Sequence, residues 1–255
     1  MNEQPKFNVE DEFAEAIRSI GGFRVTELLG MSPGHPNADF AFPADSVVAE
    51  LKCLDKDQIN DARIIEKASE LYVEELVAGR APVVAFGDVH MTTAGFSEEH
   101  VRKIAGLYRV PVERVVKKAA VQIENTVGPL DISEPIGFLL LANDNHSALD
   151  PAHMAALVNE ILAKPDYSSI DIAILFSGNL AAAFPGSSHR VDYWIVIGRR
   201  TITPELHEFI VRLREAWLSR LEIIFGNKRS YAGPGDMQTL INLETRRDTT
   251  LGKFR

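Results

Sequence analysis

Three ionisable residues, Asp39, Glu50 and Lys52, stand in a stretch that otherwise has the pattern of a buried β-hairpin, "PNADFAFPADSVVAELKCL" at residues 36–54. Apolar segments on either side of "FPADS" predict two short strands joined by a tight turn. Side chains two apart in a strand point to the same face, so Glu50 and Lys52 share one. Because the hairpin is antiparallel, Asp39 comes next to the Glu50 end of the second strand. The spacing therefore predicts three charged groups on one patch.

Two carboxylates held a few ångströms apart repel each other unless a proton or a cation lies between them. A divalent ion bound by Asp39, Glu50, a backbone carbonyl and water removes that repulsion, and Mg²⁺ or Mn²⁺ suits such oxygen ligands. Phosphodiester hydrolysis needs a metal that polarises the phosphate and activates water, together with an amine that offsets developing charge. Lys52 supplies the amine. Whether Lys52 abstracts the proton or only stabilises charge stays open.

The same residues resemble the PD-(D/E)XK nuclease superfamily, the group with the restriction-endonuclease-like fold. "NAD" is followed by ten residues and then by "ELK", and that family carries Asp on its second core strand and (Asp/Glu)-x-Lys on its third. The resemblance implies an α/β fold with a mixed sheet flanked by helices, and a Mg²⁺-dependent nuclease acting on DNA. It also implies metal ligation by Asp39, Glu50 and the Leu51 carbonyl, with Lys52 as the catalytic amine.

Two parts of the family pattern are matched less closely. The family's proline before the Asp is Ala38 here, and Pro36 stands three residues upstream of the Asp. Many members also use an acid from the first helix. Glu10 and Glu12 flank the apolar face of the expected helix, whereas Glu15 points away from it. The sequence leaves open which of the first two reaches the site.

The elements that must position this hairpin alternate in the order helix, strand, hairpin, helix. Helical spacing of apolar residues predicts helices over 9–20 and 55–80, and "FRVTELLG" at 23–30 predicts the first strand. Strands are also expected over 81–89, 136–144, 170–179 and 191–200, and helices over 151–163 and 203–225. Trp194, Phe209 and Trp217 fall at apolar positions and are expected in the core.

The middle of the chain is interpreted as a helical insertion at about 92–127, with two helices broken at Val110-Pro111. A helix-turn-helix is disfavoured because Arg109 stands where the turn usually has glycine. A helical hairpin that packs on the core or serves an oligomer interface fits better. Three basic residues in this segment could meet phosphate: Arg114, Lys117 and Lys118.

Composition indicates one domain over 1–225 followed by a basic tail over 226–255, which holds six Lys or Arg against three acids and is expected to be solvated. The chain has 255 residues, 45% of them hydrophobic, and a formal net charge of −9. An acidic chain is not typical of non-specific nucleic-acid binding. The absence of a long apolar run indicates no membrane and a cytoplasmic protein, and the single Cys53 is interpreted as a buried filler.

Other features are weaker. The seven histidines show no metal-ligand spacing, although His35 precedes the hairpin and could contact substrate. The loop over 175–190 follows a strand but lacks a nucleotide-binding pattern. Two alternatives stay open: a catalytically inactive nuclease-fold module that binds nucleic acid or a protein partner, and an unrelated α/β protein whose hairpin carries a surface ion pair. A homodimer would suit cleavage of two strands.

Overall fold

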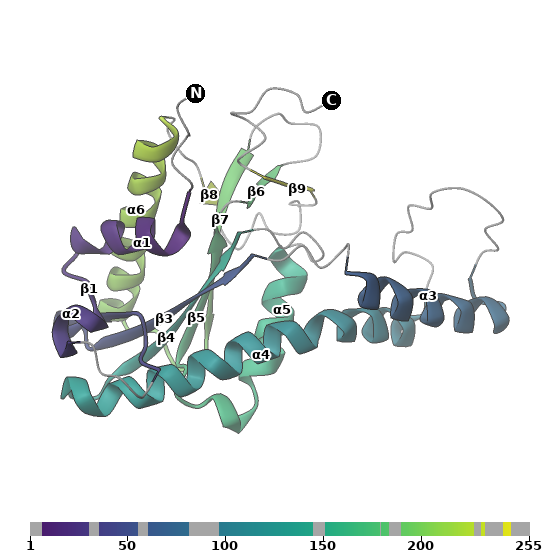
Figure 1. The fold of residues 1–255 in the computed structure, drawn as a ribbon, viewed down its shortest axis with the longest axis horizontal. Coiled ribbons are helices and arrows are strands. Elements are labelled where there is room, and N and C mark those ends of the chain that lie inside the picture. The colour runs from purple at the N-terminus through teal and green to yellow at the C-terminus, as the bar shows by residue number, and fades with distance from the viewer. Residues whose placement is uncertain are drawn as a thin grey trace.

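The protein is an α/β fold in which helices flank a mixed sheet, as the sequence predicts (Figure 1). The computed structural model describes residues 7–30, 36–55, 61–81, 97–144, 151–178, 180–183, 190–226, 231–232 and 242–245. The strands are β1 (Phe23–Arg24), β2 (Phe40–Phe42), β3 (Val47–Leu54), β4 (Ile136–Asn143), β5 (Ile172–Ser177), β6 (Leu180–Ala183), β7 (Arg190–Gly198), β8 (Tyr231–Ala232) and β9 (Asn242–Thr245). The helices are α1 (Val9–Arg18), α2 (Val25–Leu29), α3 (Ala62–Val77), α4 (Glu98–Leu130), α5 (Pro151–Leu162) and α6 (Pro204–Phe225).

The sheet has the order β1-β2-β3-β4-β5-β7, continued by β6 and β9, and β8 pairs with β7. The first three strands form an antiparallel meander. Strands β3, β4 and β5 are parallel, and β7 returns antiparallel to β5. Since β3 and β4 are parallel neighbours, the chain between them must cross over the sheet, and α3 and α4 lie in that crossover.

The two faces of the sheet bury separate apolar clusters. Helices α1 and α6 cover one face, where Phe13 packs between Phe40, Phe176 and Trp217 at ring-centroid distances of 5.4–5.6 Å. Helices α4 and α5 cover the other face, where Val48 and Leu54 of β3 join the apolar cluster. The charged residues Glu50 and Lys52 lie between them on the same face of the strand. The three aromatic residues expected in the core are buried, with Trp194 5% exposed and the other two 1%.

The expected strand over 23–30 is mostly helical in the structure. Only Phe23 and Arg24 pair with β2, and the next five residues form α2. The last backbone hydrogen bond of this pairing joins the N–H of Val25 to the carbonyl of Asp39, directly before β2 begins. Residues 26–28 are exposed, so they gain nothing from an extended conformation. The expectation of a full first strand was therefore wrong.

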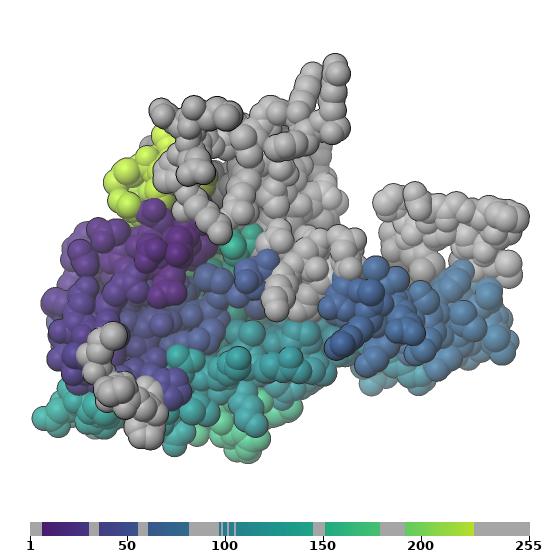
Figure 2. Space-filling view, in the orientation of Figure 1, coloured from purple at the N-terminus to yellow at the C-terminus, as the bar shows by residue number. Residues whose placement is uncertain are grey.

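The expected break at Val110-Pro111 is also wrong, because α4 runs unbroken through Pro111. Val112 and the apolar residues that follow at helical spacing are fully buried on the sheet, whereas Val110 is 58% exposed. Burial on the sheet thus outweighs the helix-breaking tendency of proline. The first part of α4 packs instead against α3, where Lys103 pairs with Glu74, and the two project from the body as an arm (Figure 1, Figure 2). Residues 112–127 of the expected insertion therefore cover the sheet.

Two pieces of the expected tail belong to the sheet, since β9 pairs with β6 and β8 pairs with β7. Neither piece is long or strongly apolar, so hydrophobic patterning does not identify them as strands. The expected strand over 81–89 lies outside the described residues, apart from its first. Among the helices that the structure describes, none is long and apolar enough to cross a bilayer.

Candidate active site

The hairpin brings Asp39 and Glu50 together through its register. Phe40 pairs with Ala49, so the next antiparallel position sets Asp39 opposite Glu50. The Oδ2 atom of Asp39 accepts a hydrogen bond of 2.9 Å from the backbone N–H of Leu51. The side chain of Asp39 therefore takes the place of a backbone partner beyond the end of β2 and is held against the strand that carries Glu50.

Helix α4 fixes the segment that leads into Asp39. The hydroxyl of Thr126 accepts a 2.6 Å hydrogen bond from the N–H of Ala38 and donates to the carbonyl of Gln122 at 2.7 Å. The amide of Gln122 donates to the carbonyl of Asn37 at 3.0 Å. Thr126 is fully buried. Sequence reasoning missed these contacts, because they join residues 85 and 88 positions apart and α4 was expected to break away as an insertion.

Glu50 is fully buried on the face of the sheet that α4 covers. One carboxylate oxygen, Oε1, pairs with the amine of Lys52, which lies two residues on and is partly exposed. The other, Oε2, is buried and accepts no hydrogen bond from the N–H and O–H groups of the described residues. A buried acceptor left in this state is costly, so this oxygen indicates a place for a proton or a cation.

The two carboxyl groups do not ionise independently. Burial, and then the charge of Asp39, raise the pKa of Glu50 to about 8 against the opposing effect of Lys52. Burial also raises the pKa of Asp39, although the Leu51 N–H and Lys52 counteract part of the increase. Near neutral pH the pair therefore retains a proton when no cation is bound. A divalent cation between the carboxylates would take the place of that proton.

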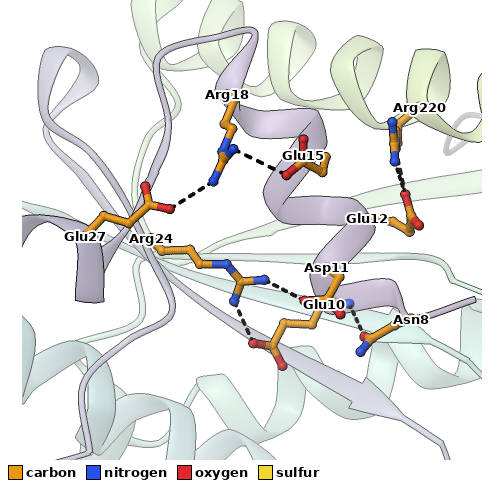
Figure 3. A network of polar contacts seen from close by, with 9 residues as sticks. All are labelled: Asn8, Glu10, Asp11, Glu12, Glu15, Arg18, Arg24, Glu27 and Arg220. Carbon is orange, nitrogen blue, oxygen red and sulfur yellow. Dashed lines mark hydrogen bonds and ion pairs between the residues drawn. The ribbon is translucent and has the colours of Figure 1, made fainter. Parts of the chain in front are cut away.

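Of the two acids left open on the first helix, Glu10 is the one whose charge reaches the site, because it raises the pKa of Asp39. The guanidinium of Arg24 holds Glu10 at 3.0 Å and lies over the ring of Phe40, 5.9 Å from its centroid. Glu12 instead receives a hydrogen bond of 2.6 Å from Arg220 on α6 (Figure 3). The two glutamates therefore have different partners: Glu10 pairs with Arg24, and Glu12 pairs with Arg220.

Glu15 is directed away from the site, as expected. Its carboxylate lies 3.4 Å from the guanidinium of Arg18, which also binds Glu27 at 3.0 Å (Figure 3). All three side chains are largely exposed. They form a surface network at the far end of α1 and carry no part of the site.

The groups that could hold a divalent cation are the carboxylates of Asp39 and Glu50. The N–H and C=O of one strand residue point to the same side, so the Leu51 carbonyl faces the side of β3 where Asp39 lies. Within the part of the chain that the structure describes, no group of three or more His, Cys, Asp or Glu is placed to hold a metal ion. Two carboxylates fit Mg²⁺, which is usually bound through one or two carboxylates, waters and substrate phosphates.

Cys53 follows on the opposite face of β3 and is half-buried. Burial, and then the charges of acids that include Asp144, Glu10 and Asp55, raise the pKa of its thiol to about 12. The thiol is therefore protonated at neutral pH and is a poor nucleophile. This agrees with a filler role.

Two weaker sequence features lie wholly or partly outside the described residues. His35 is among the residues that are not described. Of the loop over 175–190, Ser177 is buried, and its hydroxyl accepts the N–H of Tyr193 at 3.0 Å, so it supports the sheet. Comparisons of the chain with models of protein families, with curated proteins and with solved structures found no match.

Proposed function

We propose that this protein is a metal-dependent nuclease that hydrolyses phosphodiester bonds in DNA. One observation carries the proposal: Asp39, the buried Glu50 and Lys52 converge on one face of a hairpin, with a buried carboxylate oxygen that accepts no hydrogen bond from the described residues. Paired carboxylates with a raised pKa beside an amine are typical of sites that do chemistry rather than of surface ion pairs. The complete burial of Glu50 also argues against a surface pair.

The strand order supports a restriction-endonuclease-like fold. A helix precedes an antiparallel β1-β2-β3 meander, a helical crossover follows, and β4 returns parallel to β3. This is the helix–strand–hairpin–helix order that the resemblance to the PD-(D/E)XK superfamily implies. Glu50 and Lys52 lie within β3, where that resemblance places them, and Asp39 stands one residue before β2, the strand on which the family carries its Asp.

The residues divide the chemistry between them. Asp39 and Glu50 would hold Mg²⁺ or Mn²⁺ together with the Leu51 carbonyl, and Glu10 adds negative charge nearby. When bound, the ion polarises a phosphate oxygen and lowers the pKa of a bound water. Lys52 keeps its amine beside Glu50, where a positive charge offsets charge that develops on the phosphate or orients the attacking water. The Leu51 N–H and Thr126 keep Asp39 and its strand in place.

A catalytically inactive module of the same fold is the second candidate. The observation that favours it is the number of acids: the described residues bring two carboxylates together but no group of three metal-binding side chains. In such a module the Glu50–Lys52 pair would only neutralise a buried charge. It would bind nucleic acid or a protein partner without cleaving it. A homodimer, which would bring two sites to the two strands of a duplex, stays a prediction.

The test is calorimetric titration of Mn²⁺ into the wild type and into Asp39→Asn and Glu50→Gln, followed by incubation of each protein with plasmid and linear DNA. We expect heat of binding and cleavage in the wild type and loss of both in each variant. Glu113→Gln is a matched control, because Glu113 of α4 also pairs with a lysine, Lys164. It should retain both activities.

The alternatives give different results. Metal binding without cleavage of any nucleic acid supports the inactive module. Equal Mn²⁺ binding by the wild type and both site variants contradicts a metal site at Asp39 and Glu50, and with it the proposed nuclease.

A further inference from the structure

The outer face of α4 carries a basic stripe made of Arg114, Lys117 and Lys118. All three side chains are exposed, while the residues between and after them, Val116 and Ala119, are buried on the sheet. Positions three and four apart lie on one side of a helix, so Arg114 lies next to both lysines. The second half of α4 is open to solvent along the side of the molecule seen in Figure 2.

None of the three side chains of the stripe takes part in an ion pair in the part of the chain that the structure describes. The nearest acid in sequence, Glu113, is held by Lys164 and by the hydroxyl of Tyr167 at 3.0 Å. The chain as a whole carries a net charge of −9. Three adjacent cations with no ion pair among the described residues therefore form a local positive patch that suits a polyanionic partner.

The stripe lies on the same part of α4 as the contacts that hold the segment leading into Asp39. Gln122 and Thr126, on the next turns of the same helix, bind the backbone of Asn37 and Ala38 beside Asp39. A helix rises about 1.5 Å per residue, so Lys118 is about 6 Å and Arg114 about 12 Å from Gln122 along the axis.

The direction in which the stripe runs from Gln122 follows from the direction of α4. Helix α4 runs into β4 through a short connection, and it lies roughly antiparallel to β3 and β4 (Figure 1). Positions before Gln122 therefore lead from the Asp39 end of the site towards the carboxyl end of β3, where Lys52 stands.

We propose that Arg114, Lys117 and Lys118 bind the phosphate backbone of the nucleic acid that is cleaved at Asp39 and Glu50, and so place the strand along α4. This inference rests on the proposed nuclease function. Lysine and arginine contacts to phosphates give most of the affinity in sequence-independent binding. The stripe thus supplies locally the positive charge that the chain as a whole lacks. The stripe lies on the outer face of the helix whose Gln122 and Thr126 hold the backbone beside Asp39.

The test measures binding without metal, so that it does not depend on cleavage. Fluorescence anisotropy of a labelled DNA duplex of mixed sequence is recorded in EDTA over a range of salt concentrations. The proteins are the wild type, the triple variant Arg114→Gln/Lys117→Gln/Lys118→Gln and a charge-matched control, Arg63→Gln/Lys67→Gln/Arg199→Gln. The control removes the same number of exposed cations from other elements. Unchanged thermal unfolding of both triple variants shows that the fold is kept.

We expect the stripe variant to bind more weakly than the control at low salt. The slope of log K against log salt should become shallower by about 0.9 for each phosphate that the variant no longer neutralises, or by about 2.7 for three phosphates. The cleavage rate of the stripe variant should fall at subsaturating DNA, because its affinity is lower, and should equal that of the wild type at saturating DNA.

Three results overturn the inference: no DNA binding by the wild type at low salt, equal loss in the two triple variants, or unchanged binding by the stripe variant. The two proposals are separable. Cleavage by the wild type with unchanged binding by the stripe variant rejects the stripe alone. Stripe-dependent binding with no cleavage in Mg²⁺ or Mn²⁺ rejects the nuclease and leaves the stripe as a nucleic-acid-binding surface.

Discussion

The carboxylate of Asp39 accepts the backbone N–H of Leu51 at 2.9 Å, between the two residues that supply the acid and the amine of the candidate site. This hydrogen bond joins the segment before β2 to β3 where backbone pairing between the two strands has ended. Asp39 is therefore positioned by the strand that it serves. The carboxyl groups of Asp39 and Glu50 affect each other's pKa, so the geometry of the site depends on the hairpin register.

Stability in EDTA should fall as pH rises from about 5 to about 8. The pKa of Glu50 is raised from 4.5 to about 8 in the fold, so in that range the folded protein holds a proton that the unfolded chain releases. Glu50→Gln cannot lose this proton. Denaturant unfolding at several pH values should show that the free energy of unfolding of Glu50→Gln increases relative to that of the wild type as pH rises.

Glu113→Gln serves as the control with the opposite sign. The hydrogen bond from Lys164 lowers the pKa of Glu113 below its ordinary value. Its contribution to stability is therefore present above pH 4.5 and is lost as pH falls below that value. A difference between Glu50→Gln and the wild type that does not change between about pH 5 and 8 would contradict the raised pKa.

Thr126→Val should destabilise the protein by about 1–3 kcal/mol, because the buried N–H of Ala38 loses its acceptor. Thr126 acts on Asp39 only through the backbone of Ala38. The valine variant should therefore have a lower kcat with little change in KM. Thr126→Ser keeps the hydroxyl and should recover most of both properties. Denaturant unfolding and steady-state cleavage measure the two effects. A valine variant equal to the wild type in both would show that α4 does not position Asp39.

Glu10→Gln should weaken Mn²⁺ binding and cleavage several-fold, because the charge of Glu10 reaches Asp39. Glu12→Gln should leave both close to the wild type, because Glu12 binds Arg220 on α6. The two residues share a helix and a charge, so each controls for the other in the same calorimetric and cleavage assays. The reverse ranking would show that the assignment of Glu10 is wrong.

Pro111→Ala should raise the free energy of unfolding by up to about 3 kcal/mol, the difference between proline and alanine in a helix interior. The new N–H at position 111 can join the backbone hydrogen bonds of α4, which already continues through this position. Urea unfolding measures the gain. A loss of stability would mean that the proline is needed where the arm leaves the body.

The hairpin was predictable because both of its determinants are local. Alternation over β3 sets the shared face of Glu50 and Lys52, and the short turn sets the register that brings in Asp39. The contacts of Thr126 and the choice between Glu10 and Glu12 were not predictable. They depend on how α4 and α6 pack, and those helices come from distant parts of the chain.

The same distinction explains the errors in secondary structure. The proline rule is local and predicts a break at Pro111, but burial of Val112 and the residues after it on the sheet keeps α4 continuous. Residues 25–29 have a strand-like composition, yet β2 is too short to pair with them. In both cases tertiary contacts outweighed local preference.

The most direct measurement of the central claim is the single-turnover rate of DNA cleavage in Mg²⁺ by the wild type and Lys52→Met. Lys164→Met is the matched control, because Lys164 also pairs with a glutamate close to it, Glu113. Metal binding should persist in Lys52→Met, since the amine is not a ligand. We expect a fall in rate of about 10²- to 10⁴-fold for Lys52→Met, the usual contribution of a positioned acid–base group, and no comparable change for Lys164→Met. Equal rates for the two variants, or no cleavage by the wild type that depends on Mg²⁺, would contradict it.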